Sequence, residues 1–199
     1  MVRSKVLGRE EERSRPVEKS KSLSANFFLT GLPGSGKTTV ITALANFLGD
    51  RASGFYTTEI RVSGKRKGFE VVTLNGEKAI LAHVDFSSHY RVGKYGVKVE
   101  NLTGAIEEIR QAIAQSEPKC LLIDEIGKME LFAPRFQETV LSALNSPLPV
   151  VATILAKTHP FCDALKRRLD VEVIEVNQKN REKLPEELYN SIIPYLNTS

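Results

Sequence analysis

One stretch restricts the possible folds of this chain more than any other, the run FFLTGLPGSGKTTVITAL at residues 27–44. Its apolar residues stop at Thr30, a loop with three glycines and one proline follows, and apolar residues then return at helical spacing. Glycine tolerates positive φ, so successive backbone N–H groups can turn inward and form a nest for an anion. A helix beginning near Lys37 adds its unpaired N–H groups and the positive end of its dipole. The stretch therefore predicts a buried strand, an anion-binding loop and a helix in direct succession.

The loop matches the phosphate-binding motif G-x-x-x-x-G-K-[ST] from Gly31 to Thr38. In this motif the lysine, here Lys37, reaches the β- and γ-phosphates of a nucleotide, and the hydroxyl of Thr38 ligates Mg²⁺. We expect Thr39 to contact the α-phosphate. The predicted phosphate-binding residues of the loop are Gly31, Leu32, Pro33, Gly34, Ser35, Gly36, Lys37, Thr38 and Thr39.

A phosphate loop that binds Mg²⁺ also needs an acidic residue for the metal, and this residue is expected at the end of a neighbouring buried strand. The run CLLIDEIGKMEL at residues 120–131 has this form, because four successive apolar residues suit a parallel strand that is covered on both faces. Asp124 ends this strand and is predicted to hold Mg²⁺ together with Thr38. Glu125 is predicted to orient and deprotonate an attacking water. The predicted nucleotide-binding residues of this segment are Leu121, Leu122, Ile123, Asp124, Glu125, Ile126, Gly127 and Lys128.

The rest of the chain alternates apolar runs with segments of helical spacing. The predicted strands lie at 149–155 and 171–176, and the predicted helices lie around 102–113, 132–144 and 159–168 and from Pro185 onward. We expect Pro194 to kink or end the last helix. This order predicts an α/β fold with a doubly wound, mainly parallel sheet. Ligands of such sheets bind at the carboxyl ends of the strands, where Thr30, Asp124 and Thr153 should lie.

Two regions interrupt this alternation. Residues 1–24 are polar, charged and almost free of large apolar side chains, so we predict a disordered leader before a P-loop domain at 25–199. Within that domain, residues 53–100 are predicted to be inserted strands, beginning with a β-hairpin whose turn is basic. This hairpin could form a lid or a pocket wall, or it could be an edge hairpin with a solvated tip.

Charge and composition exclude several classes of function. The net charge is +4, but residues 1–22 carry seven basic and four acidic side chains, so the remainder is close to neutral and offers no clear nucleic-acid surface. No apolar run approaches the 18 or so residues of a membrane span. Cys120 and Cys162 are far apart in the sequence, which indicates ordinary packing in a reducing, cytoplasmic setting.

Several longer runs resemble one known family, the small cancer-related nucleoside-triphosphatases found from thermophilic prokaryotes to animals. These runs are GFYTTEIR at 54–61, GKYGVKVE at 93–100 and DEIGKMELF at 124–132. The resemblance extends from about Asn26 to the C-terminal helix, and it gives the leader no role. It implies a P-loop NTPase domain of the RecA-like type that hydrolyses many nucleoside triphosphates, slowly and with little base preference.

Other polar residues are candidates for the remaining roles. An arginine is expected near the transferring phosphoryl group, and Arg61 and Arg66 on the inserted hairpin are the favoured catalytic candidates, ahead of Arg167 and Arg168. Glu59 is a weaker rival to Glu125 as the base.

Further contacts with the nucleotide are also expected. Thr153 is a candidate sensor of the γ-phosphate, or simply a hydrogen-bonded hydroxyl at a strand end. Asn180 and Arg181 are candidates for the base, because a guanidinium plane can stack on any base. Lys128 could pair with Glu125 or with a phosphate.

The sequence thus favours Mg²⁺-dependent hydrolysis of ATP, GTP, CTP and UTP, and leaves two alternatives open. One is a small-molecule or nucleotide kinase, which the adjacent acids at Asp124 and Glu125 disfavour, because such a pair suits water as the acceptor. The other is a nucleotide-dependent switch or a nucleic-acid-associated ATPase. The residues after the leader are close to neutral, so they offer no basic surface for binding nucleic acid.

Overall fold

The computed structural model describes residues 26–115, 117 and 119–197, so the predicted leader lies outside the described residues. The strands are β1 (Asn26–Thr30), β2 (Ala52–Val62), β3 (Lys65–Thr73), β4 (Lys78–His83), β5 (Tyr90–Val92), β6 (Tyr95–Val97), β7 (Cys120–Ile126), β8 (Val150–Ile154) and β9 (Val171–Glu175). The helices are α1 (Lys37–Leu48), α2 (Thr103–Ala114), α3 (Pro134–Leu144), α4 (Pro160–Lys166) and α5 (Leu184–Leu196).

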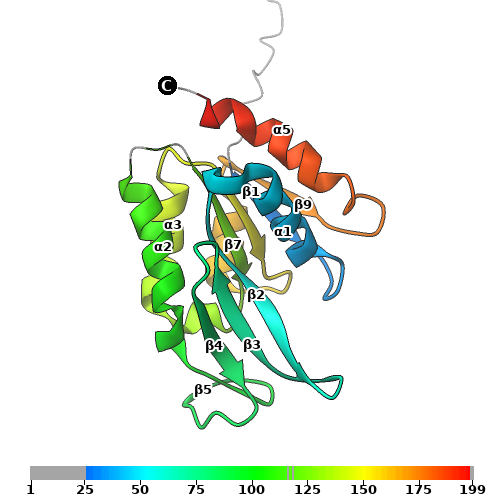
Figure 1. The fold of residues 1–199 in the computed structure, drawn as a ribbon, viewed down its shortest axis with the longest axis vertical. Coiled ribbons are helices and arrows are strands. Elements are labelled where there is room, and N and C mark those ends of the chain that lie inside the picture. The colour runs from blue at the N-terminus through cyan, green and yellow to red at the C-terminus, as the bar shows by residue number, and fades with distance from the viewer. Residues whose placement is uncertain (1–25, 116, 118, 198–199) are drawn as a thin grey trace, which may run out of the picture.

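The described strands form one nine-stranded sheet in the order β5-β6-β4-β3-β2-β7-β8-β1-β9 (Figure 1). All pairings from β2 to β9 in this order are parallel. On the other side of β2, the successive pairings β2–β3, β3–β4, β4–β6 and β6–β5 are antiparallel. The predicted doubly wound α/β fold is confirmed, and its parallel core continues into an antiparallel extension.

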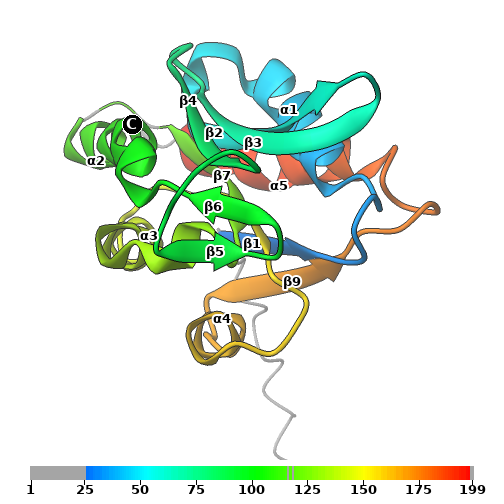
Figure 2. The same cartoon turned by 90° about the horizontal axis from the view of Figure 1, so that it is seen from below.

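Helices cover both faces of the sheet. Figure 2 shows α2 and α3 on one side and α1 and α5 on the other, and each pair encloses its own group of buried apolar residues. Strand β7 contributes to both groups, with Leu121 and Ile123 facing α2 and α3 and with Cys120 and Leu122 facing α1 and α5. This arrangement explains the continuous apolar run of β7, since successive side chains of a strand point to opposite faces.

The antiparallel region begins later in the chain than residue 53, where the inserted strands were predicted to start. Residues 52–55 of β2 pair in parallel with residues 120–123 of β7, so the strand starts inside the parallel core. The same strand then pairs with β3 up to Val62. The sequence of β2 shows no change of pattern between the residues that pair with β7 and the residues that pair only with β3. The predicted start of the insertion at residue 53 therefore lies too early in the chain.

The C-terminal helix extends two residues past the second of its prolines. Pro185 lies in the first turn of α5, as predicted, and the helix continues through Pro194 to Leu196, so Pro194 itself does not end it. A proline inside a helix removes the hydrogen bond to the carbonyl four residues earlier, and here this loss is confined to the last turns of α5. The ring of Tyr189 on α5 lies 6.0 Å from that of Phe47 on α1, so the two helices pack together. Among the described residues, we find no helix with the length and apolar character that crossing a membrane requires.

Candidate active site

The candidate site lies where the parallel strands end. The loop after β1 passes beside the end of β9, and Gly31 in this loop has φ of 139°. A Cβ atom on Gly31 would lie only 2.7 Å from the carbonyl oxygen of Val176, so the close approach of the two segments requires glycine here. Gly36, with φ of 103°, caps the N-terminus of α1 and delivers Lys37 into its first turn.

Lys37 folds back over the phosphate loop. Its Nζ atom donates hydrogen bonds of 3.1 Å to the carbonyl oxygens of Gly31 and Leu32. The ammonium group therefore stands above the loop with the backbone carbonyls as its partners. Ser35 Oγ is buried in the same loop, and no hydrogen-bond partner is found for it among the described residues.

Asp124 lies two residues before the end of β7, so the strand continues past it instead of ending there as predicted, and 2% of Asp124 is exposed. Thr38 donates to its Oδ2 over 2.7 Å, Thr153 donates to its Oδ1 over 2.5 Å, and the backbone amide of Thr57 faces the carboxylate. Burial raises the pKa of Asp124, and these donors together with nearby Lys37 oppose that rise. The phosphate loop and the acidic strand end thus meet at one carboxylate.

Glu125 follows directly and is half-buried. Burial, and after it the neighbouring charge of Asp124, raises the pKa of Glu125, whereas Lys37 opposes the shift. Glu125 lines a pocket of about 330 Å³ at the edge of the sheet. The other lining residues are Pro33, Gly34, Gly36, Lys37, Thr38, Thr39, Thr57, Thr58, Glu59, Phe69 and Asp124.

The oxygen atoms at this edge fit a magnesium ion. A hydroxyl and a carboxylate within hydrogen-bond distance of each other, from Thr38 and Asp124, are the hard oxygen donors that Mg²⁺ prefers. Among the described residues, no group of three or more histidine, cysteine or acidic side chains could hold a metal. This small protein donor set suits Mg²⁺, which usually takes one or two protein ligands and completes its shell with waters and substrate phosphates.

Other predicted residues have different surroundings. Leu121, Leu122, Ile123 and Ile126 are fully buried in β7, so their side chains support Asp124 from within the core. Thr153 is also fully buried and gives its hydroxyl to Asp124. In the turn after β7, Gly127 is buried whereas Lys128 is exposed.

The two favoured arginines share one acid on the hairpin of β2 and β3. Arg61 donates from Nε to Oε2 of Glu59 over 2.8 Å, and Arg66 donates to Oε1. The Arg66 hydrogen bond is the largest cause that holds the pKa of Glu59 below its ordinary value. Arg66 also donates to the hydroxyl of Tyr95 and lies 5.1 Å from the centre of the Phe69 ring. Both guanidinium groups are therefore tied to Glu59, which itself faces the pocket.

The structure separates Arg168 from this pocket. Arg168 pairs with Asp170 and donates to Asn145, which lies between α3 and the start of β8. These partners precede β8 and β9, so they mark the amino-terminal edge of the parallel strands, opposite the phosphate loop.

Asn180 and Arg181 lie in the loop after β9. Asn180 braces this loop, since its Nδ2 donates to the carbonyl of Glu175 over 2.8 Å and its Oδ1 accepts from the N–H of Asn177 over 2.9 Å. The exposed Arg181 reaches the phosphate loop, because a Cβ atom on Gly36 would lie 3.1 Å from its Cδ. Arg181 and Gly36, together with Thr39, line a second hollow beside the first turn of α1.

Sequence reasoning missed three parts of this arrangement. Thr57 and Thr58 line the pocket beside Asp124, and the TTE run at 57–59 was the available signal for them. Phe69 gives the pocket its aromatic wall. Glu130 is a buried acid beside Glu125, and the sequence carried no mark that distinguished it from a surface acid.

Comparison with known proteins decides the family. A family model described as NTPase matches residues 26–189. The chain belongs to this NTPase family. It is 52% identical over 170 residues to the nucleoside-triphosphatase THEP1 of Natranaerobius thermophilus, which covers 84% of this chain and 96% of that protein. The name of this NTPase relative places it among the hydrolases.

Solved structures of NTPase-family proteins have the same fold. The crystal structure of THEP1 from Aquifex aeolicus has a TM-score of 0.77 at 35% identity, and covers 84% of this chain and 98% of that one. The solution structure of a human cancer-related nucleoside triphosphatase has a TM-score of 0.72 at 36% identity, and covers 84% of this chain and 96% of that one. The resemblance noted in the sequence is confirmed, as is the P-loop NTPase fold.

Proposed function

We propose that this protein is an Mg²⁺-dependent hydrolase that converts ATP, GTP, CTP and UTP to the corresponding nucleoside diphosphate and inorganic phosphate. One observation supports the proposal above all, the meeting of Thr38 and Asp124 in a pocket that Lys37 and Glu125 also line. Phosphoryl transfer depends mainly on positioning and charge neutralisation, and these four side chains can provide both.

Each residue has a specific role in this proposal. Lys37 exchanges its loop carbonyl partners for the β- and γ-phosphates, and the N–H groups of the loop and of α1 bind the remaining phosphate oxygens. Thr38 and Asp124 would hold Mg²⁺, which when bound neutralises charge on the phosphates. Glu125 orients the attacking water and accepts its proton. Thr57 and Thr58 of β2 also line this pocket.

Slow turnover and broad base preference are consistent with the remaining contacts. Arg61 and Arg66 are held by Glu59 and are not among the residues that line the pocket, so either must leave this acid to reach the γ-phosphate. Arg181, on the opposite side of the loop, offers a guanidinium plane on which any base can stack. We infer a cytoplasmic location, because Cys120 and Cys162 are both buried as free thiols.

Phosphate release tests the proposal. Purified protein should release phosphate from all four nucleotides with Mg²⁺, and chelation by EDTA should stop it. Lys37→Ala should abolish release, whereas Lys78→Ala, at the exposed start of β4 and outside the pocket lining, should retain it. Glu125→Gln should keep nucleotide binding and lose about 10²–10⁴-fold in kcat, the usual contribution of a general base. Undiminished release by Lys37→Ala, or phosphate transfer to an added acceptor in place of water, would contradict the proposal.

A further inference from the structure

Glu130 is a buried acid beside the pocket for which the mechanism above has no role. It opens the 3₁₀ turn Glu130–Phe132 after β7, and 5% of it is exposed. The backbone amides of Gly127 and of Glu130 itself face its carboxyl group and oppose the rise of its pKa. The N–H of Leu131 donates to the carbonyl oxygen of Gly127 over 3.0 Å and closes the turn. The carboxyl group is therefore enclosed by the segment that follows Glu125.

Gly127 lies between two carboxyl groups. A Cβ atom on this glycine would lie 2.9 Å from Oε2 of Glu130 and 3.1 Å from both Cδ and Oε1 of Glu125. The two side chains thus converge on one point and leave no room there for a methyl group. Glu125 lines the phosphate pocket, and Glu130 does not, so Glu130 stands behind it.

We propose that Glu130 is a positioning residue that supports the carboxylate of Glu125 across Gly127 and keeps it turned toward the phosphate pocket. The inference rests on the proposed function, because it concerns the orientation of the proposed base. Glu130 acts only through Glu125.

The electrostatics of the turn agree with this geometry. Burial, followed by the charges of Glu125 and Asp124, raises the pKa of Glu130 to about 8. A carboxyl group with this pKa is mostly protonated at neutral pH, so it adds bulk and a hydrogen-bond donor without adding a negative charge next to the base. A glutamine side chain, which is uncharged and of the same shape, is therefore its closest substitute.

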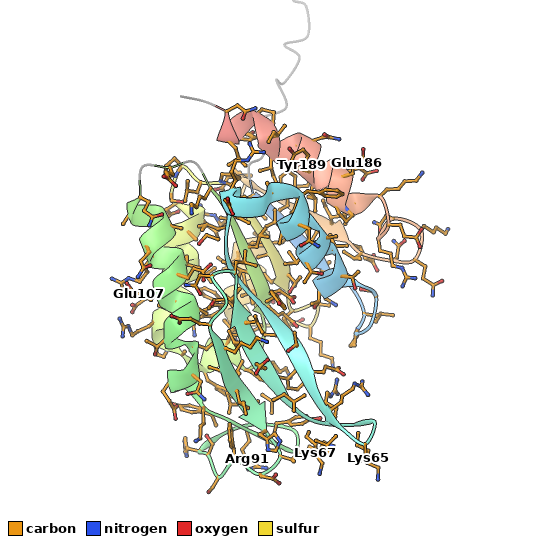
Figure 3. All side chains as sticks on the ribbon, in the orientation of Figure 1. Lys65, Lys67, Arg91, Glu107, Glu186 and Tyr189 are labelled. Atoms are coloured by element: carbon orange, nitrogen blue, oxygen red, sulfur yellow. The ribbon has the colours of Figure 1, made fainter. Side chains whose placement is uncertain are left out.

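Three variants test the proposal in steady-state phosphate release from Mg-ATP. Glu130→Gln should keep kcat within about threefold of wild type, because shape and charge are retained. Glu130→Ala should lower kcat at least about tenfold and leave KM nearly unchanged, since the base is misplaced while the nucleotide contacts remain. Gly127→Ala should have the same signature, because its methyl group pushes both carboxyl groups apart. Glu107→Ala on the outer side of α2 serves as the control (Figure 3).

The outcomes separate this inference from the proposed function. Circular dichroism and the dissociation constant of a fluorescent ATP analogue establish that each variant is folded and binds nucleotide. A folded Glu130→Ala with the kcat of wild type would refute the inference alone, and so would a Glu130→Gln that is as slow as Glu130→Ala. Absence of phosphate release from the wild type would refute the proposed function and the inference with it.

Discussion

The hydroxyl of Thr38 donates a hydrogen bond of 2.7 Å to Oδ2 of Asp124, although 86 residues separate the two along the chain. Because Thr153 donates to the other carboxylate oxygen, both oxygens are fixed in this structure. The oxygen of the Thr38 hydroxyl keeps its lone pairs while its hydrogen points to Asp124, so in the proposed site Thr38 could bind Mg²⁺ and still donate this hydrogen bond. The hydrogen bond would then hold the two proposed metal ligands side by side.

In the proposed site the hydroxyl of Thr38 is essential and its methyl group is dispensable, because the hydroxyl alone would bind the metal and donate to Asp124. We expect Thr38→Ala to lose about 10–100-fold in activity and to require more Mg²⁺ for half-maximal rate, whereas Thr38→Ser should stay close to wild type. Magnesium titrations of phosphate release measure both effects. Thr42→Ala is the matched control, since its hydroxyl bonds the carbonyl of Thr38 and lies outside the pocket lining. Equal magnesium dependence in Thr38→Ala and wild type would remove Thr38 from the metal site.

The hairpin arginines should differ in how much they contribute to turnover. Arg66 is also tied to Tyr95 and Phe69, whereas Arg61 is the more exposed of the two, so we expect Arg61 to be the one that reaches the γ-phosphate. Arg61→Ala should lower kcat at least about tenfold, less than the ~10³–10⁵ of a fully placed arginine. Lys65→Ala and Lys67→Ala are controls, because these side chains lie on the same hairpin (Figure 3). Unchanged kcat in Arg61→Ala would show that the guanidinium group of Arg61 does not stabilise the negative charge of the transition state.

Arg181 should govern affinity without selecting the base. We expect Arg181→Ala to raise KM for ATP, GTP, CTP and UTP by similar factors, on the order of tenfold, and to leave kcat nearly unchanged, since a lost stacking contact costs about 1–3 kcal/mol. Comparing the four KM values checks this. A loss confined to one nucleotide would instead indicate a contact specific to that base.

The buried acid Glu130 should make stability depend on pH. Its pKa rises from an ordinary value of 4.5 to about 8 on folding, so between these pH values the folded state binds more protons than the unfolded state. Stability from this group is therefore present below about pH 4.5 and is lost as the pH rises toward 8. The free energy of unfolding of Glu130→Gln relative to wild type should increase by about 1–3 kcal/mol from pH 5 to pH 8. Urea titrations at both pH values measure it, and Glu107→Gln should show no such trend.

Local patterns in the sequence were enough to predict the main architecture. The apolar run of β7 predicted burial on both faces because its residues alternate between two cores, and the glycines at 31 and 36 predicted the loop because both have positive φ. The predicted order of strands and helices followed from the same signals. Each of these features depends on residues that are close together along the chain.

Features that depend on distant contacts were harder to predict. From the sequence, Thr153 is a candidate phosphate sensor at the end of a strand. Its hydrogen bond to Asp124 becomes evident only when the fold places β8 beside β7. Glu130 resembles a solvated acid until the fold buries it behind Gly127. Likewise, Arg61 and Arg66 share Glu59 only because β2 and β3 pair in the observed register. Tertiary packing determines all of these relationships, and no local pattern encodes them.

Strand β2 has two neighbours that constrain it differently. Its first residues pair with β7, Thr57 lines the pocket together with Asp124, and its last residues carry Glu59 and Arg61 along β3. A slip of one residue along this strand would exchange its two sets of side chains and misplace Thr57. Natural gains or losses of residues in this part of the family should therefore concentrate at the tip between residues 62 and 65, where extra length extends outward without shifting the end of the strand beside Asp124.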